Sequence, residues 1–138
     1  MIIVDRNTPP GFTLVRAFEP FSFDELLERA AEDISELGPA PVLGRPFLLD
    51  FREIDLMRFD AEDFKRLMSQ RMRMSELYGD TPCAMVAKTE GGFGMLRMYE
   101  AYAEMAGLRG EGLVLITVDY DEAVGWISDW VKRKEARP

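Results

Sequence analysis

The sequence predicts a single α/β domain, with elements in the order β-β-α-β-α-β-α-β-α and a mixed, mostly parallel sheet that has an antiparallel first strand. Three observations predict this class. Strand-sized apolar runs alternate with segments whose apolar residues recur at helical spacing. Serine and aspartate residues suited to helix capping stand between the two kinds of segment. The length of 138 residues fits one hydrophobic core, without a linker or internal repeat.

The N-terminal part predicts a hairpin followed by a helix. Residues 2–4 form a short apolar strand and residues 12–21 a second one, with a turn rich in proline and glycine between them. We expect these two strands to pair antiparallel. Ser22, with Glu25 three residues later, predicts a capped helix that Gly38 ends.

Three further strand–helix pairs are predicted along the rest of the chain. Each strand is a nearly continuous apolar run, which is typical of a buried parallel strand. Alternating strands and helices imply right-handed crossovers. A polar tail occupies residues 132–138. The predicted elements are strand 46–51, a helix capped by Asp60 that ends at Gly79, strand 82–88, a helix that starts behind Gly94 and ends at Gly107, strand 111–120, and a helix capped by Asp119 that runs to Val131.

Composition argues against several classes of protein. The net charge of −8 disfavours nucleic-acid binding, which needs a cationic surface. No apolar run approaches the ~20 residues of a transmembrane helix, and the first residues lack the pattern of a signal peptide. Cys83 is the only cysteine, so no internal disulfide can form. We therefore expect a cytoplasmic protein.

Charge is distributed unevenly over the first two predicted helices. Residues 19–36 contain seven acids and one base, a local charge of −6, and residues 58–73 contain five bases and three acids, a local charge of +2. The segments are either two solvated helix faces or a polarised surface that orients a partner.

The sequence offers little catalytic chemistry. Histidine is absent, which excludes Ser-His and Cys-His nucleophiles and removes the commonest metal ligand. Cys83 lies in an apolar strand and is interpreted as structural. Asp50, Glu53 and Asp55 lie near the end of a predicted strand, but the odd spacing of Asp50 and Glu53 points them to opposite faces. We expect no catalytic residues, no metal site and no cofactor, with a carboxylate-only enzyme as a remote third hypothesis.

A glycine cluster precedes the third predicted helix. Gly91, Gly92 and Gly94 stand where exposed N–H groups attract anions. The cluster lacks the lysine and hydroxyl residues of a P-loop, so a tight turn explains it equally. An alternative ligand site for an anion, nucleotide or acyl group is therefore predicted here, with Asp60 nearby.

The third predicted helix carries more apolar residues than one buried face needs. Leu96, Tyr99 and Ala103 form one stripe, and methionines with Tyr102 form a second. Neighbouring helices could cover both stripes, the second could bind a partner or a second copy, or it could line an apolar pocket. The candidate partner-binding residues, two of them on the preceding helix, are Met95, Met98, Tyr102, Met105, Met68 and Met72.

Three phrases of the sequence, PFLLDFREID, GMLRMYEAYAE and VDYDEAVGWI, resemble the SpoIIAA-like superfamily, which contains the STAS domains and, more distantly, the CRAL-TRIO domains. Together these phrases look like those of the small stand-alone bacterial STAS-like proteins. The resemblance spans residues 12–131 and implies a βα superhelix and a regulatory role through protein binding. Family members that are switched by phosphorylation carry a serine where this chain has Phe59 and Asp60. Asp60 is thus either a fixed negative charge or a helix cap.

The sequence as a whole predicts a non-enzymatic STAS-like module that binds a protein partner or forms a homodimer through the methionine- and tyrosine-rich helix. The alternative hypothesis is a sensor or carrier of a small ligand.

Overall fold

Five strands form one sheet in the order β1-β2-β3-β4-β5. The computed structural model describes residues 1–38, 45–73, 81–107 and 113–136. The strands are β1 (Ile2–Thr8), β2 (Phe12–Phe18), β3 (Phe47–Glu53), β4 (Cys83–Val86) and β5 (Val114–Thr117). The helices are α1 (Phe23–Leu37), α3 (Ala61–Arg73), α5 (Glu90–Met105) and α6 (Tyr120–Ala136), with one 3₁₀ turn, η1 (Leu56–Arg58).

The strand directions confirm the predicted sheet. β1 pairs antiparallel with β2, where Val4 lies opposite Val15. The pairs β2–β3, β3–β4 and β4–β5 are all parallel. The chain is therefore an α/β protein with a mixed sheet whose first strand is antiparallel, as the sequence predicts.

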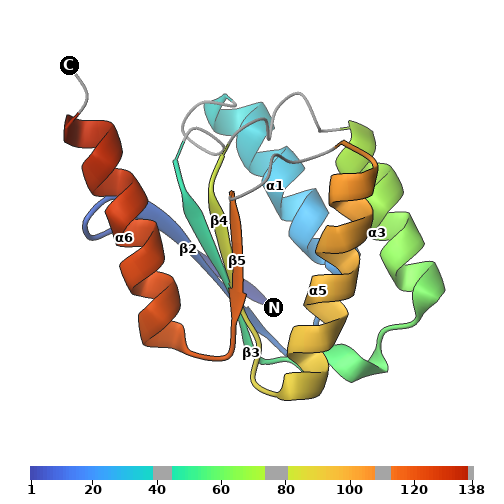
Figure 1. Ribbon diagram of the computed structural model, residues 1–138. Helices are drawn as coiled ribbons and strands as arrows, with labels where there is room; N and C mark the ends of the chain where they lie inside the picture. The colour runs from blue at the N-terminus through green and yellow to red at the C-terminus, as the bar shows by residue number, and fades with distance from the viewer. Residues whose placement is uncertain (39–44, 74–80, 108–112, 137–138) are drawn as a thin grey trace.

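The helices are divided unequally between the two faces of the sheet. Figure 1 shows α1, α3 and α5 together on one side and α6 on the other. Each of the first three helices connects one strand to its parallel neighbour, and each step moves in the same direction across the sheet. Right-handed crossovers then place all three on one face. α6 follows the last strand and packs over β3, β4 and β5 from the opposite side.

Two hydrophobic cores result from this arrangement. Along β3 the side chains alternate, so that Phe47 and Leu49 face the three helices and Leu48 faces α6. The larger core contains a group of phenylalanines, in which the rings of Phe23 and Phe59 are 4.6 Å apart. Both faces of β3 are covered, which explains why its sequence is apolar without polar alternation.

The boundaries of α1 follow the predicted capping residues, whereas α6 continues past the predicted end at Val131 to Ala136, through most of the predicted polar tail. Ser22 Oγ accepts a hydrogen bond from the Glu25 backbone N–H, and Gly38 ends α1 with a φ of 84°. The Glu25 carboxylate pairs with the N-terminal amine of Met1 at 3.2 Å, so it does not complete the predicted capping box. The predicted end of the second helix at Gly79 lies outside the described residues.

The turn η1 was not predicted, and the strand lengths differ from those expected. Asp55 begins η1 by accepting a hydrogen bond from the Met57 backbone N–H at 3.0 Å. A single turn contains too few residues to show a helical period. β1 extends to Thr8 because its polar residues still pair with β2 along the sheet edge. β5 is shorter than the predicted run of residues 111–120.

Candidate functional site

The glycine cluster lies inside α5 and not before it. The helix begins at Glu90, and Thr89 is its N-cap, with Thr89 Oγ1 accepting the Gly92 N–H at 3.0 Å. The predicted start behind Gly94 is therefore wrong. The hydroxyl of Thr89 allows the helix to begin before the glycines, and it occupies one N–H group that an anion would otherwise use.

Two of the glycines allow η1 to pack closely against the first turn of α5. A Cβ atom on Gly91 would lie 3.0 Å from Met57 Sδ. A Cβ atom on Gly92 would lie 3.4 Å from Leu56 Cδ1. Both glycines thus have a packing role, which accounts for them without a ligand.

Gly94 differs from its two neighbours because a Cβ atom there would meet no other atom within 4 Å. We expect Gly94→Ala to raise the free energy of unfolding by about 0.5–1 kcal/mol, since alanine lowers the entropy of the unfolded chain. Urea unfolding measures this change. Gly91→Ala is the matched control and should give no such gain, because its new methyl group meets Met57. Equal gains at both positions would contradict the packing role of Gly91.

α5 buries one side and exposes the opposite side, and both are apolar. Leu96, Tyr99 and Ala103 are buried against the sheet. Gly94, Met98, Ala101 and Met105 recur at spacings of four, three and four residues on the side away from the core, and all four are exposed. We call these four residues the α5 stripe. A helix face turned to solvent normally carries charged residues, whereas these four positions carry none; the charged residues that α5 exposes are Glu90, one turn before Gly94, and Arg97 and Glu104 at the border of the stripe.

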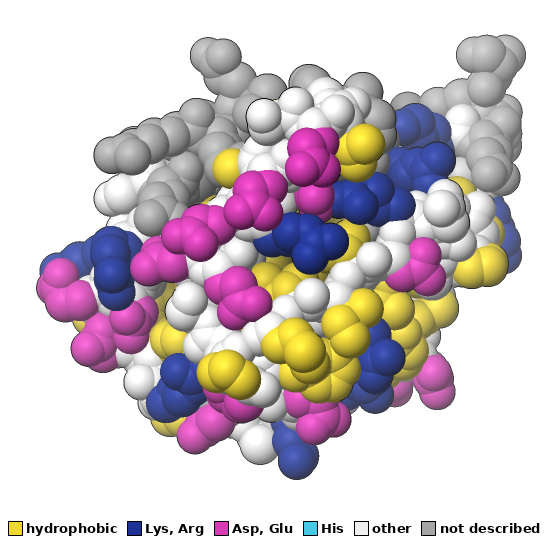
Figure 2. Space-filling model, turned by 180° about the vertical axis from the view of Figure 1, so that it is seen from behind, with side chains coloured by type: hydrophobic (Ala, Val, Ile, Leu, Met, Phe, Trp, Pro, Cys, Tyr) yellow, Lys and Arg dark blue, Asp and Glu magenta, His cyan; other side chains and the backbone are white. Residues whose placement is uncertain are grey.

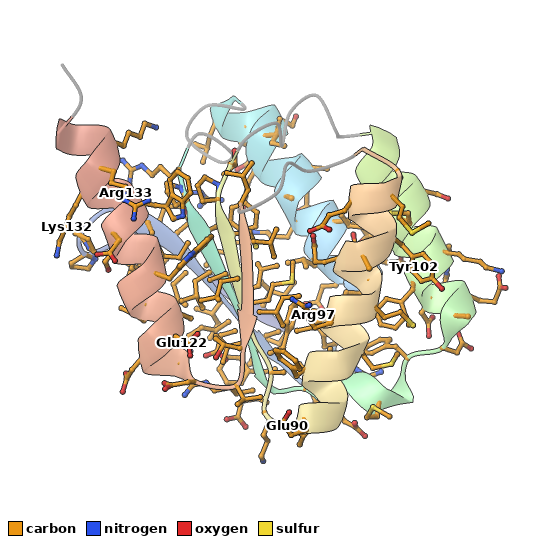
Figure 3. All side chains as sticks on the ribbon, viewed as in Figure 1. Glu90, Arg97, Tyr102, Glu122, Lys132 and Arg133 are labelled. Atoms are coloured by element: carbon orange, nitrogen blue, oxygen red, sulfur yellow. The ribbon has the colours of Figure 1, made fainter. Side chains whose placement is uncertain are left out.

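Polar and charged side chains border the α5 stripe on both sides. Tyr102, which is 55 % exposed, projects toward α3, and Arg97 projects toward the sheet (Figure 3). Glu104 lies on the same side as Arg97, where a groove of about 100 Å³ separates α5 from the edge strand β5. Protein interfaces commonly have an apolar centre with a polar rim, and the α5 stripe with its border has the same pattern.

The six predicted partner-binding residues do not all lie on this surface. Met98 is 39 % exposed and Met105 84 % exposed, and with Tyr102 they form the open side of α5. Met95 and Met68 are partly buried and pack against the larger core, so their main contacts stabilise the fold. The side chain of Met72 lies outside the described part of the structure.

One exposed residue beside the stripe was missed by sequence reasoning. Met57 of η1 is 58 % exposed and contacts the first turn of α5 at Gly91. It is separated from α5 by a helix and a strand, so helical periodicity could not relate it to Met98. The sequence signal that could have indicated an exposed Met57 was its position next to the charged Arg58 in a short connection.

Asp60, the proposed companion of the glycines, is engaged in capping α3. Its carboxylate accepts the Asp63 N–H at 2.9 Å, and the Asp63 carboxylate accepts the Asp60 N–H at 2.9 Å. The bond from the Asp60 N–H is the main cause that lowers the pKa of Asp63 below its ordinary value, and the Asp60 side chain and Arg66 lower it further. Two carboxylates at this position oppose the binding of an anion.

Two of the other singled-out carboxylates, Asp50 and Asp55, also have structural partners. Asp50 is buried and accepts two hydrogen bonds from the Arg52 guanidinium, each 2.9 Å long. These bonds raise the pKa of Arg52. Asp55 begins η1, and Glu53 is exposed at the end of β3. Within residues 1–38, 45–73, 81–107 and 113–136, no group of three acidic or cysteine side chains converges as a metal site would require.

The opposite charges of the first two helices partly neutralise each other. Arg66 of α3 lies 3.5 Å from the Asp24 carboxylate of α1. Arg58 of η1 pairs with Glu19 at 2.9 Å. The acidic residues that remain in solvent along α1, Glu28, Glu32 and Glu36, form a row on its outer side. This arrangement favours a solvated face over a surface polarised between two helices.

Comparison of the chain with protein-family models, with curated proteins and with solved structures gives no match. Among the helices that the structure describes, none combines the length and the apolar character that crossing a membrane requires.

Proposed function

We propose that this chain is a non-enzymatic, STAS-like regulatory module that acts by binding protein, and that its first partner is a second copy of itself. The observation that carries the proposal is the α5 stripe, an uncharged row of glycine, alanine and methionine on the solvent side of a helix. Exposed apolar surface of this kind is stabilised when another molecule covers it.

The pattern of the stripe is complementary to itself. A two-fold axis between Ala101 and Tyr102 would set two α5 helices antiparallel. Met98 of one copy would then lie opposite Met105 of the other, since the two residues are equally distant from the axis. Gly94 has no side chain and Ala101 has only a methyl group, which would let the two helices approach closely.

The border of the stripe supports the same axis. Arg97 and Glu104 lie on the same side of α5. A two-fold axis places this side of one helix next to the same side of the other helix. Arg97 of each copy would come close to Glu104 of the other, which gives two complementary charge pairs. On the opposite border the two Tyr102 rings would meet, and tyrosine is enriched in interfaces.

A non-enzymatic role is supported by the chemistry of the chain. It contains no histidine, and Asp50, Asp55 and Asp60 are engaged in hydrogen bonds that hold the fold. The resemblance to STAS-like proteins, in which binding and not catalysis is the usual activity, agrees with this.

Sedimentation velocity over a series of protein concentrations tests the proposal. We expect a species of twice the chain mass of 15.8 kDa at micromolar concentration, in reversible exchange with the monomer. A single species of 15.8 kDa at every concentration up to about 1 mM, which corresponds to about 4 kcal/mol of binding free energy, would contradict self-association.

A further inference from the structure

A second feature lies away from the α5 stripe, between α1 and the first three strands. A partly open pocket of about 90 Å³ is lined by apolar side chains of the sheet and by one face of α1. Figure 2 shows the back of the molecule, where hydrophobic side chains are visible in a hollow next to a group of Lys and Arg side chains and a row of acidic ones. The apolar lining includes Val4, Val15, Leu26 and Leu49.

Two buried hydrogen-bond donors in this pocket have no partner in the protein. Thr13 is 5 % exposed and its Oγ1 makes no hydrogen bond, although its backbone N–H is bonded to Pro46 O at 3.0 Å. Arg6 Nε is also buried without a hydrogen bond. Both residues line the pocket. Buried donors left unpaired cost free energy, so native proteins provide them with a partner.

The charged residues that line the pocket are Arg6, Arg29 and Asp33. Arg6 contacts the Asp33 carboxylate through its terminal nitrogen, and Arg29 Nε donates to Asp33 at 3.2 Å. Two guanidinium groups therefore share one carboxylate, which leaves a net charge of +1 at the polar end of the pocket. A ligand that accepts hydrogen bonds and carries negative charge complements this end of the pocket.

The other end of the pocket is apolar and lies next to a second pocket. This second pocket of about 60 Å³ lies under α1, α3 and α5, and both pockets are lined by Leu26, Phe47 and Leu49. The first pocket of about 90 Å³ is partly open, so it suits a short apolar chain of about four to six carbon atoms whose end remains in solvent.

We propose that this pocket binds a short-chain monocarboxylate, with its carboxylate on Arg6 Nε and Thr13 Oγ1 and its hydrocarbon tail between α1 and the sheet. The pocket is separate from the self-association surface. It lies between α1 and the sheet, whereas the α5 stripe lies on the solvent side of α5. The pocket and the glycine cluster also lie at opposite ends of the parallel strands. Thr13 and Phe47 are at the N-terminal ends of β2 and β3, whereas Gly91 follows the C-terminal end of β4.

Titration of the ¹⁵N-labelled full chain with sodium hexanoate, followed by NMR, tests the site. We expect saturable shifts centred on the backbone amides of Thr13, Ala30 and Leu49, with a Kd of about 1 mM or lower. Hexanol has the same tail without the charge and should bind at least about tenfold more weakly, because a charged acceptor makes the stronger hydrogen bonds. Acetate, which lacks the tail, should not saturate. Absence of saturable hexanoate shifts, or equal affinity for hexanol, overturns the proposal.

Two variants separate binding from folding. Thr13→Val keeps the side-chain shape and removes only the hydroxyl, so hexanoate should bind at least about tenfold more weakly while the melting temperature does not fall. Ala30→Leu fills the pocket from α1 and should abolish saturable binding. Ala31→Leu is the control, since Ala31 is exposed on the same helix and does not line the pocket. Wild-type affinity in Thr13→Val or in Ala30→Leu overturns the proposal. Met98→Glu should bind hexanoate normally, so this proposal and self-association can fail separately.

Discussion

Replacing Met98 with glutamate is expected to raise the dissociation constant of the homodimer at least about 100-fold, which corresponds to about 2.7 kcal/mol. In the antiparallel arrangement each dimer contains the substitution twice, and each new carboxylate faces the methyl group of Met105 in the other copy. Burying a charge without a partner strongly disfavours association. Met98 is 39 % exposed in the single chain, so the fold itself should tolerate the change. Sedimentation velocity gives the dissociation constant, and thermal unfolding of dilute protein reports the stability of the fold.

Ala31→Glu is the matched control for this substitution. It places the same charge on an exposed position of α1, which lies outside the stripe, and should leave the dissociation constant unchanged. A charge exchange tests the two-fold axis itself. Arg97→Glu should weaken the dimer, and addition of Glu104→Arg should restore it, since the pair then forms with reversed signs. If Met98→Glu associates as tightly as the wild type, the α5 stripe is not the interface.

Replacing Ile127 with alanine is expected to lower the free energy of unfolding by about 3 kcal/mol, within the range of buried isoleucine truncations. Ile127 is completely buried and packs in the smaller core with Phe12, Leu48 and Val86. Within the described residues α6 is the sole helix on this face of the sheet, so no neighbouring helix can move in to fill the cavity. Urea unfolding measures the loss.

Ile127→Val is the graded control for the same position. It removes one methylene group and should cost about 1 kcal/mol. A loss below about 1 kcal/mol for the alanine variant would show that α6 contributes little to the fold, in disagreement with the buried core that it forms with the sheet.

The path of the chain through the fold was largely predictable because its signals are local. Ser22, Asp60 and Asp119 were each expected at a helix start, and each accepts backbone N–H bonds there. Apolar runs located β3 and β4 because central strands have both faces covered. The start of α5 was misplaced since three glycines disfavour a helix, and the contact with η1 that explains two of them is not visible in the sequence.

The candidate site was predictable only in part. The apolar excess of α5 could be read from helical spacing, but five methionines and one tyrosine, two of the methionines on the preceding helix, were assigned to one partner surface on equal terms. The structure places Met95 and Met68 against the core and leaves Met98, Tyr102 and Met105 open. Periodicity gives the angle between two stripes of a helix, whereas the position of the sheet decides which stripe is covered.

The sequence by itself determined the order of the strands and main helices, the capping roles of Ser22, Asp60 and Asp119, and the surplus of apolar side chains on α5, because each depends on residues within one or two turns of each other. Only the tertiary structure decided that Met57 lies beside the stripe and that Arg6, Thr13 and Asp33 meet at one pocket. These residues are far apart along the chain, and the packing of α1 and α5 on the sheet brings them together.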